Sequence, residues 1–167
     1  MIKARKKMAT VYNEDGNTEK VDIGYVGEVE SIDISIVQDL LERDYIPVIA
    51  PIGVGQDGES YNINADYVAA EIAGALHAEK LLLLTDIDGV YKDFEDKDSF
   101  ISTLTVAEAK EYIKEGIISG GMIPKIEACL KSIEAGTNKV HIIDGRQPHS
   151  IILELLTNSG IGTQVVK

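Results

Sequence analysis

The sequence has 167 residues, of which 44% are hydrophobic and 26% charged, as expected for one globular domain or for two small lobes that share a sheet. A formal charge of −12 and an aromatic content of 5% argue against a basic, aromatic surface for nucleic acid. The single cysteine, Cys129, excludes an intramolecular disulfide, and no apolar run approaches the ~20 residues of a membrane span, so we expect a cytoplasmic protein without membrane partners.

The first third of the chain predicts a hairpin, a helix and a strand. Residues 11–29 are typical of a polar hairpin, with its turn near Asp15 and Gly16. The stretch "DISIVQDLLERD" repeats apolar residues at helical spacing behind a possible cap at Asp33. The apolar run "YIPVIAPI", residues 45–52, then predicts a buried strand.

The rest of the chain alternates helices and strands. A glycine-rich loop precedes a predicted helix over 65–76, and "KLLLLTD" predicts a second buried strand, followed by an exposed, acid-rich loop over 91–100. Thr105 and Glu108 have the spacing of a capping box. Further helices are expected over 106–116, 124–135 and 149–158, and further strands over 139–144 and 162–166.

This alternation predicts an α/β domain with a largely parallel sheet covered on both faces. In such sheets, ligands bind beyond the carboxyl ends of the strands, where loops lead into helices. The polar and glycine-rich loops at those positions are therefore the candidate ligand-binding segments.

The motif "YNINAD" has two interpretations. Asn64 is a good helix N-cap and Asp66 suits the first helical turn, so capping explains both. Asn62 is not explained in this way. The two asparagines could donate to a carboxylate or phosphate, and Asp66 could orient a lysine or a metal ion, so both interpretations stay open.

The motif "LLLLTDIDGVY" is also ambiguous. A turn commonly uses Asp and Gly, which explains Asp88 and Gly89. An apolar strand followed by Asp-x-Asp-Gly-Val also resembles the first motif of haloacid-dehalogenase-like phosphohydrolases, in which the first aspartate is a nucleophile. That class would need a downstream acidic pair for magnesium, and the chain offers only Asp144 in "IIDGR".

The motif "ISGGMIPK" places Lys125 in the first turn of the helix expected over 124–135, with Pro124 at the first helical position. The helix dipole disfavours a cation there by roughly 0.3–1 kcal/mol. Bare glycine backbone, helix N–H groups and a lysine together would attract an anion, an arrangement suited to phosphoryl transfer or to a binding module. The alternative is a solvated surface lysine beside a flexible turn.

Six segments together resemble the N-acetylglutamate kinases of the amino acid kinase family: "YIPVIAPIGVG", "YNINAD", "LLLLTD", "GIISGGMIPK", "VHIIDGR" and "GIGT". Their order and spacing match over nearly the whole chain. The resemblance implies a three-layer αβα sandwich with a mainly parallel sheet, and phosphorylation of the γ-carboxylate of N-acetyl-L-glutamate by ATP with Mg²⁺ in arginine biosynthesis.

The resemblance also implies residue roles. Lys125 would stabilise the charge of the phosphates, Asp66 would organise catalytic lysines, and Asn62, with Asn64 nearby, would bind acetylglutamate. No residue is assigned as a direct metal ligand. The residues expected around the nucleotide are Thr85, Asp86, Ile87, Asp88, Gly89, Val90, Tyr91, Ile117, Ile118 and Ser119.

The chain departs from the family pattern at its front, since no Lys-x-Gly-Gly motif occurs in it. We therefore expect an N-terminally truncated member, with residues 1–77 as the remainder of the amino-acid-substrate lobe and residues 78–167 as the nucleotide lobe. Such a chain could be inactive alone and act as a nucleotide-binding or regulatory protein. Partners would be its small-molecule substrates and either further copies of itself or an N-terminal segment.

Overall fold

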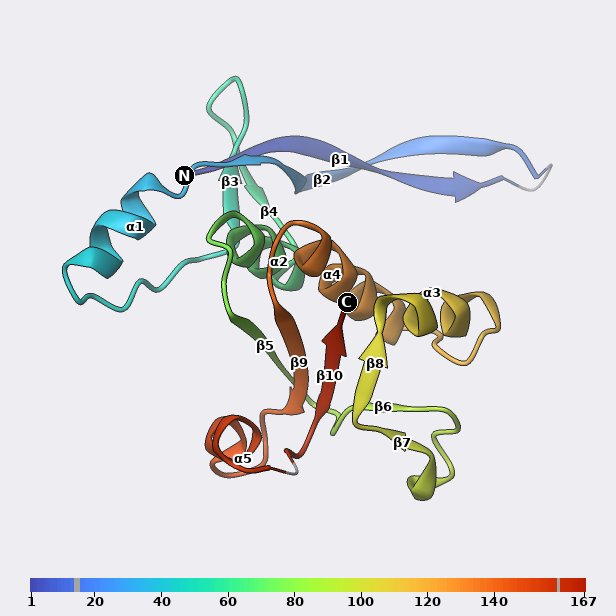
Figure 1. The fold of residues 1–167 in the computed structure, drawn as a ribbon. Helices are drawn as coiled ribbons and strands as arrows, with labels where there is room; N and C mark the ends of the chain where they lie inside the picture. Colours follow the sequence, from blue (N-terminus) through green and yellow to red (C-terminus); the bar gives the residue numbers. More distant parts are fainter. Residues whose placement is uncertain (14–15, 159) are drawn as a thin grey trace. The chain divides into compact units, whose positions relative to one another are not determined.

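The computed structural model describes residues 1–13, 16–158 and 160–167, and the chain divides into two compact units (Figure 1). Unit 1 comprises Met1–Ile72 and unit 2 comprises Ala73–Lys167. Helix α2 (Ala65–Ala75) begins in the first unit and ends in the second. We describe each unit by itself.

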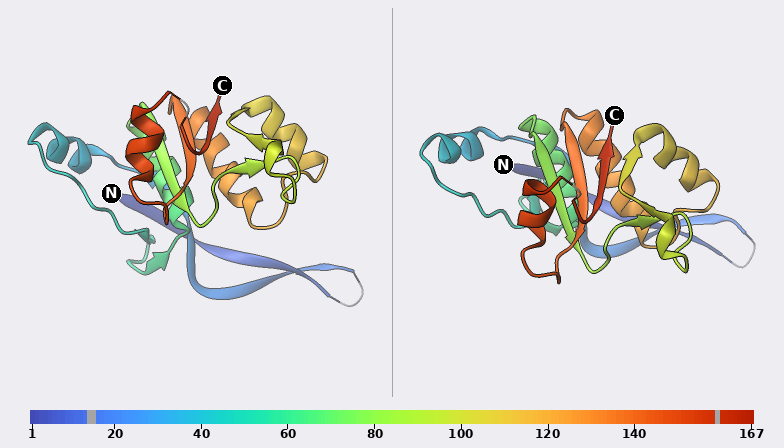
Figure 2. Two further views of the ribbon diagram at one scale, coloured as in Figure 1. Left: turned by 90° about the horizontal axis from the view of Figure 1, so that it is seen from below. Right: turned by 60° about the horizontal axis from the view of Figure 1, so that its bottom comes forward.

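Unit 1 is built on a long antiparallel hairpin of β1 (Ile2–Tyr12) and β2 (Thr18–Ile32), which Figure 2 shows as a twisted ribbon. Its register runs from Ile2 opposite Ile32 to Tyr12 opposite Thr18. The predicted hairpin is thus confirmed, although its strands extend well beyond residues 11–29. Asp15, expected near the turn, lies outside the described residues.

Two short strands close this hairpin into a small barrel. Strands β3 (Ile52–Val54) and β4 (Ser60–Asn62) pair with each other antiparallel, and they run parallel to β1 and β2, respectively. The barrel requires a glycine at Gly53, because a Cβ there would lie 2.6 Å from the Cβ of Ala4. Its small interior therefore depends on close backbone approach.

The predicted helix behind Asp33 is confirmed as α1 (Ser35–Glu42), and the Asp33 carboxylate accepts the Ser35 N–H at 3.0 Å. The predicted buried strand over 45–52 is wrong, because residues 45–51 form no strand and β3 begins only at Ile52. Ile46 and Val48 are 90% and 96% exposed. A buried strand needs a neighbouring strand to pair with, and the barrel strands of the described chain pair with one another instead.

Unit 2 contains a four-stranded mixed sheet in the order β5 (Lys80–Thr85), β9 (Lys139–Asp144), β10 (Thr163–Val166) and β8 (Thr103–Thr105). Strands β5 and β9 are parallel, as are β10 and β8, whereas β9 and β10 are antiparallel. Together with the helices, this sheet confirms the α/β class. A two-stranded antiparallel ribbon of β6 (Val90–Tyr91) and β7 (Phe100–Ile101) encloses a loop with the short helix η1 (Lys97–Ser99).

The helices of unit 2 follow the predicted order: α3 (Val106–Lys114), α4 (Met122–Glu134) and α5 (Ser150–Leu156). Helix α4 packs on β9 and β10, and α5 packs on β9. The core includes Leu104, Ile126, Ile133 and Val140. The predicted capping box is confirmed. The Thr105 side chain accepts the Glu108 N–H, and the Glu108 carboxylate accepts the Thr105 N–H at 2.8 Å.

Candidate functional site

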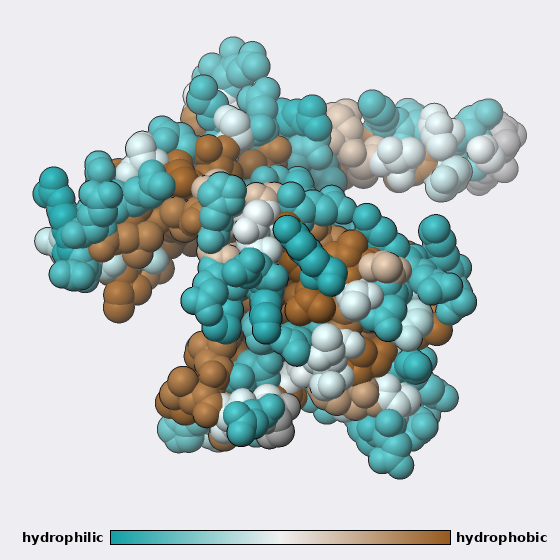
Figure 3. Space-filling model, viewed as in Figure 1, coloured by the Kyte–Doolittle hydropathy of each residue, from teal (hydrophilic) through white to brown (hydrophobic). Residues whose placement is uncertain are grey.

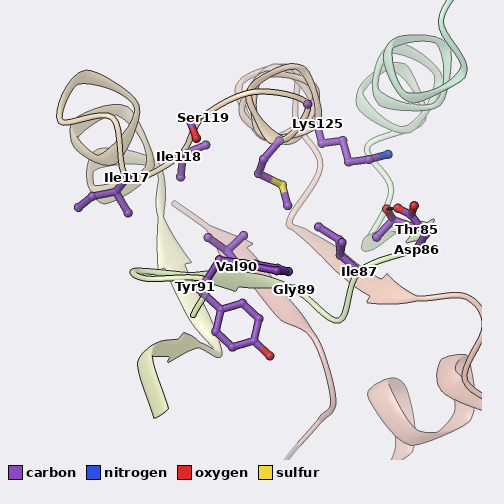
Figure 4. Close-up of a pocket in the computed structure, with 13 residues that line it drawn as sticks. Thr85, Asp86, Ile87, Gly89, Val90, Tyr91, Ile117, Ile118, Ser119 and Lys125 are labelled. Atoms are coloured by element: carbon purple, nitrogen blue, oxygen red, sulfur yellow. Dashed lines mark hydrogen bonds between the residues drawn. The ribbon is translucent and has the colours of Figure 1, made fainter. Parts of the chain in front are cut away.

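Unit 2 holds a cavity of about 490 Å³ beyond the carboxyl end of β5. Its walls come from the end of β5, from the β6 ribbon and from the segment that leads into α4 (Figure 4). It brings together most of the residues that the sequence assigned to a nucleotide, together with the lysine: Thr85, Asp86, Ile87, Gly89, Val90, Tyr91, Ile117, Ile118, Ser119 and Lys125.

One end of the cavity is polar. Figure 4 shows the Lys125 side chain extending from α4 toward the side on which Thr85 and Asp86 lie. Gly120 and Gly121 precede this helix, and a Cβ built on either would meet no atom within 4 Å. Gly121 and Lys125 both line the cavity, so exposed glycine backbone and a lysine adjoin the same space, which favours an anionic ligand.

The start of α4 corrects one expectation. The helix begins at Met122, so Pro124 is its third residue rather than its first. The N–H groups of Met122 and Ile123 donate to the carbonyls of Ser119 and Gly120 at 3.2 and 3.3 Å, which extends the helix toward the glycines. Because these two donors are engaged, attraction of an anion depends on Lys125 and the glycine backbone more than on open helix N–H groups.

The other end is aromatic and apolar. The Tyr91 ring meets Phe94 edge to face at a centroid distance of 5.9 Å and Phe100 at 5.2 Å. The Tyr91 hydroxyl donates to the Asp88 carboxylate at 2.7 Å, and this hydrogen bond, together with burial, raises the pKa of Tyr91 to about 12. Asp88 is not among the residues that line the cavity, and its contact is with Tyr91.

Sequence reasoning gave no role to two residues that line the cavity, Phe94 and Met122, and it considered Gly121 only as part of the glycine pair before Lys125. Gly121 and Met122 belong to the motif "ISGGMIPK", so the whole motif could have been predicted to line the nucleotide site. Phe94 lies in the acid-rich loop over 91–100, for which the sequence predicts only exposure. A large aromatic residue among acids was the available sign of a further role.

Arg146 is a further charged group at this edge of the sheet. It forms a two-point ion pair with Asp144, with both nitrogen–oxygen distances at 2.9 Å. The hydrogen bonds from Arg146 lower the pKa of Asp144, and those to Asp144 raise the pKa of Arg146, with smaller contributions from Asp86 and Asp88. The guanidinium thus neutralises Asp144 at this edge of the sheet and interacts more weakly with Asp86 and Asp88.

The three predicted acceptor-site residues lie in unit 1. The Asn64 side-chain oxygen accepts the N–H groups of Asp66 and Tyr67 at 2.9 and 3.3 Å, so Asn64 does cap α2. Asp66 is half-buried in the first turn of that helix. Asn62 is exposed at the end of β4, where its backbone pairs opposite Ile52.

Within the described ranges 1–13, 16–158 and 160–167, no group of three or more His, Cys, Asp or Glu side chains is placed to hold a metal ion. None of the helices there has the length and apolar character needed to cross a membrane.

Comparison with known proteins gives a family match. The sequence model described as "Amino acid kinase family" matches residues 5–144. The chain is 52% identical to an acetylglutamate kinase from Moorella thermoacetica over 166 residues, which cover 99% of this chain and 56% of that protein. It is 49% identical to an acetylglutamate kinase from Methanococcus aeolicus, over 100% of this chain and 56% of that protein. The chain thus spans about half the length of the curated relatives it matches.

Solved structures show the same fold. An N-acetylglutamate synthase from Neisseria gonorrhoeae, complexed with coenzyme A and N-acetyl-glutamate, aligns with a TM-score of 0.82 at 28% identity, over 99% of this chain and 36% of that chain. A carbamate kinase from Giardia lamblia bound to AMP-PNP aligns with a TM-score of 0.65, over 96% of this chain and 52% of that chain. Its identity is 18%, so this second likeness concerns the fold alone.

Proposed function

The chain belongs to the amino acid kinase family, and on that premise we propose that it serves as an acetylglutamate kinase. The reaction would move the γ-phosphoryl group of ATP to the γ-carboxylate of N-acetyl-L-glutamate. The observation that carries the proposal is a cavity lined by Lys125, by the Gly121 backbone and by the aromatic Tyr91 side chain. The curated relatives, which carry the acetylglutamate kinase name, support the choice of acceptor.

We assign residues 78–167 to the nucleotide lobe. The polarity of the cavity orients ATP, since its charged phosphates belong beside Lys125 and its base belongs at the Tyr91 end. Mg²⁺ would accompany the nucleotide and neutralise charge on its phosphates, because a magnesium ion commonly binds through phosphates and one or two carboxylates rather than in a protein cage.

Lys125 is the cavity residue whose charge would stabilise phosphoryl transfer. During transfer, a γ-carboxylate oxygen forms a bond to the γ-phosphorus while the bond to the ADP oxygen breaks, giving an acylphosphate and ADP. Negative charge moves across the phosphoryl oxygens, and a fixed ammonium group stabilises it without reorganisation. We propose this role for Lys125.

We assign residues 1–77 to the amino-acid-substrate lobe. Since the Asn64 oxygen caps α2, its amide N–H groups are the part that could donate to acetylglutamate, beside the exposed Asn62 amide. Asp66 would organise catalytic lysines through its negative charge. These three roles follow the resemblance to the family.

A second candidate function is nucleotide binding without catalysis. An exposed apolar segment in unit 1 favours it: Ile46 and Val48 are almost fully exposed, and α1 exposes Ile36 and Leu41. Figure 3 shows this hydrophobic surface over α1 and the chain that follows it. Contiguous apolar surface of this kind marks an interaction site, so we propose that unit 1 associates with a further copy or with a segment like the part of the relatives that this chain does not match.

Calorimetry and acylphosphate trapping separate the two candidates. Titration with Mg-ATP measures binding, and hydroxylamine converts an acylphosphate into a hydroxamate that can be measured. ATP binding with hydroxamate formation supports the kinase. The second candidate is supported if the chain binds ATP but forms no hydroxamate, even after an N-terminal portion of a complete acetylglutamate kinase is added. For either function, we would expect the protein to be located in the reducing cytoplasm.

A further inference from the structure

Phe94 is an aromatic side chain whose exposure its own fold does not explain. It lies in the loop between β6 and β7, among residues that are mostly acidic, and is 63% exposed. It nevertheless lines the cavity beside Tyr91. Most of the Phe94 side chain is not buried by the chain itself, so its apolar surface contributes little to the stability of the fold. Contact with a bound ligand would bury that surface.

The loop that carries Phe94 is held by hydrogen bonds around Ser99. The Ser99 hydroxyl lies 2.7 Å from the Asp93 carbonyl and 2.6 Å from the Asp96 carbonyl, and it accepts the Asp93 N–H at 3.0 Å. The Lys92 N–H donates to the Ser99 carbonyl at 3.1 Å. These bonds fix the backbone on both sides of Phe94, so its exposure does not result from a loose loop.

Side chains fix the position of the ring as well. The Lys97 ammonium lies 4.6 Å from the centroid of Tyr91 and 5.0 Å from that of Phe94, which links the two rings. The Tyr91 hydroxyl in turn donates to the Asp88 carboxylate at 2.7 Å. Phe94 and Tyr91 therefore form a preorganised pair of rings at the cavity.

We propose that Phe94, together with Tyr91, binds the base of the nucleotide and makes the site prefer purine over pyrimidine nucleotides. This inference rests on the proposed function, in which the ligand is ATP. Figure 4 shows Tyr91 away from Lys125, so the base and the phosphates have separate ends. A purine presents two fused rings to the aromatic pair and a pyrimidine only one, so the larger base gains more from the contact.

The test compares Phe94→Ala with the wild type by calorimetry, using the magnesium complexes of ATP, GTP, CTP and UTP, and inorganic tripolyphosphate. We expect Phe94→Ala to lower the affinity for ATP and GTP by about tenfold and the affinity for CTP and UTP by less. The affinity for tripolyphosphate should not change. Phe94→Trp should retain purine affinity. Leu156→Ala, which removes a residue that is 79% exposed and lies away from the cavity lining, is the matched control and should change nothing.

Two outcomes would refute the role of Phe94 alone, and a third would also refute the proposed function. An ATP affinity in Phe94→Ala within twofold of the wild type, or an equal loss for ATP and CTP, refutes the role of Phe94 while the proposed function stands. Wild-type protein that binds neither ATP nor tripolyphosphate refutes the proposed function together with the inference. A thermal melt of each variant confirms that the fold is intact.

Discussion

Thr85 and Asp144 lie opposite each other at the carboxyl ends of the parallel strands β5 and β9, and the Gly145 N–H donates to the Thr85 carbonyl at 2.8 Å. This pairing brings the loop that contains Asp86 and the loop that contains Arg146 to one edge of the sheet. The cavity opens at that edge. The position of the site thus follows from strand register, as the general rule for open α/β sheets predicts.

The first prediction concerns Lys125. Lys125→Ala should weaken Mg-ATP binding at least tenfold, because it removes the ammonium group placed beside the phosphates. The melting temperature should change little, since a lysine near the start of a helix contributes little to its stability. Calorimetry and a thermal melt measure both quantities.

Lys131→Ala is the control for this variant, because it removes an exposed lysine from the same helix outside the cavity lining. It should leave ATP affinity unchanged. If Lys125→Ala binds ATP as tightly as the control does, Lys125 is a solvated surface lysine and the orientation proposed for the nucleotide is wrong.

The second prediction concerns Asp66. Asp66→Asn should leave ATP affinity within a few fold but reduce acylphosphate formation by at least tenfold, because the substitution keeps the side-chain shape and removes the charge. The hydroxamate assay measures the reaction, and calorimetry measures the affinity. Asp39→Asn, an exposed change on α1, serves as the control. Loss of folding in Asp66→Asn would mark Asp66 as structural instead.

The sequence predicted features whose causes are local. Thr105 and Glu108 are three residues apart and satisfy each other's hydrogen bonds, so the start of α3 could be read from spacing alone. The start of α4 could not, because the carbonyls of Ser119 and Gly120 extend that helix by two residues.

Features that depend on distant partners escaped the sequence. The apolar run over 45–52 has the composition of a buried strand, yet composition does not reveal whether a neighbouring strand is present. Phe94 escaped for a related reason. The loop sequence shows its charges, whereas the contacts of Ser99 and Lys97 that direct the ring to the cavity appear only in three dimensions.

The third prediction concerns Tyr91. Because the folded pKa of about 12 exceeds the ordinary value of 10, the stabilising contribution of the protonated hydroxyl is fully present below pH 10 and is lost as the pH rises through 12. An absorbance titration of the tyrosine hydroxyls should therefore include an ionisation step near pH 12. Tyr91→Phe should remove it, and Asp88→Asn should shift it toward 10. Absence of a Tyr91-dependent ionisation step above pH 10 in the folded protein would contradict the Asp88 contact.

The fourth prediction concerns Glu154, a buried acid in unit 2. It accepts the N–H groups of Ile161 and Gly162 at 2.7 and 2.9 Å and pairs with His141 at 2.6 Å. Glu154→Ala leaves these donors without their acceptor and should lower the free energy of unfolding by about 1–3 kcal/mol. Urea denaturation at pH 7 measures the change. Equal stability of variant and wild type would show that other groups replace the acceptor.

The pH dependence of the same group has a definite sign. Burial raises the pKa of Glu154, but the hydrogen bonds from Ile161, His141 and Gly162 outweigh burial and lower it overall. The contribution of the carboxylate is therefore present above the ordinary glutamate range and is lost as the pH falls through the lowered folded value. The gap in stability between wild type and Glu154→Ala should narrow in acid.

The fifth prediction concerns the activity of the chain alone. Holding donor and acceptor in line can supply roughly 7–11 kcal/mol of barrier reduction, and this chain spans about half the length of its relatives. We expect the purified chain to bind ATP but to transfer phosphate poorly. Turnover comparable to that of a complete acetylglutamate kinase, without any addition, would refute this expectation.

Acylphosphate trapping tests the central claim most directly. Hydroxylamine is added to the chain with Mg-ATP and N-acetyl-L-glutamate, alone and after addition of the N-terminal portion of a complete acetylglutamate kinase. We predict hydroxamate that requires both substrates, increases with the added portion and disappears in Lys125→Ala. No hydroxamate under either condition from folded protein, or equal amounts from wild type and Lys125→Ala, would contradict the proposed kinase.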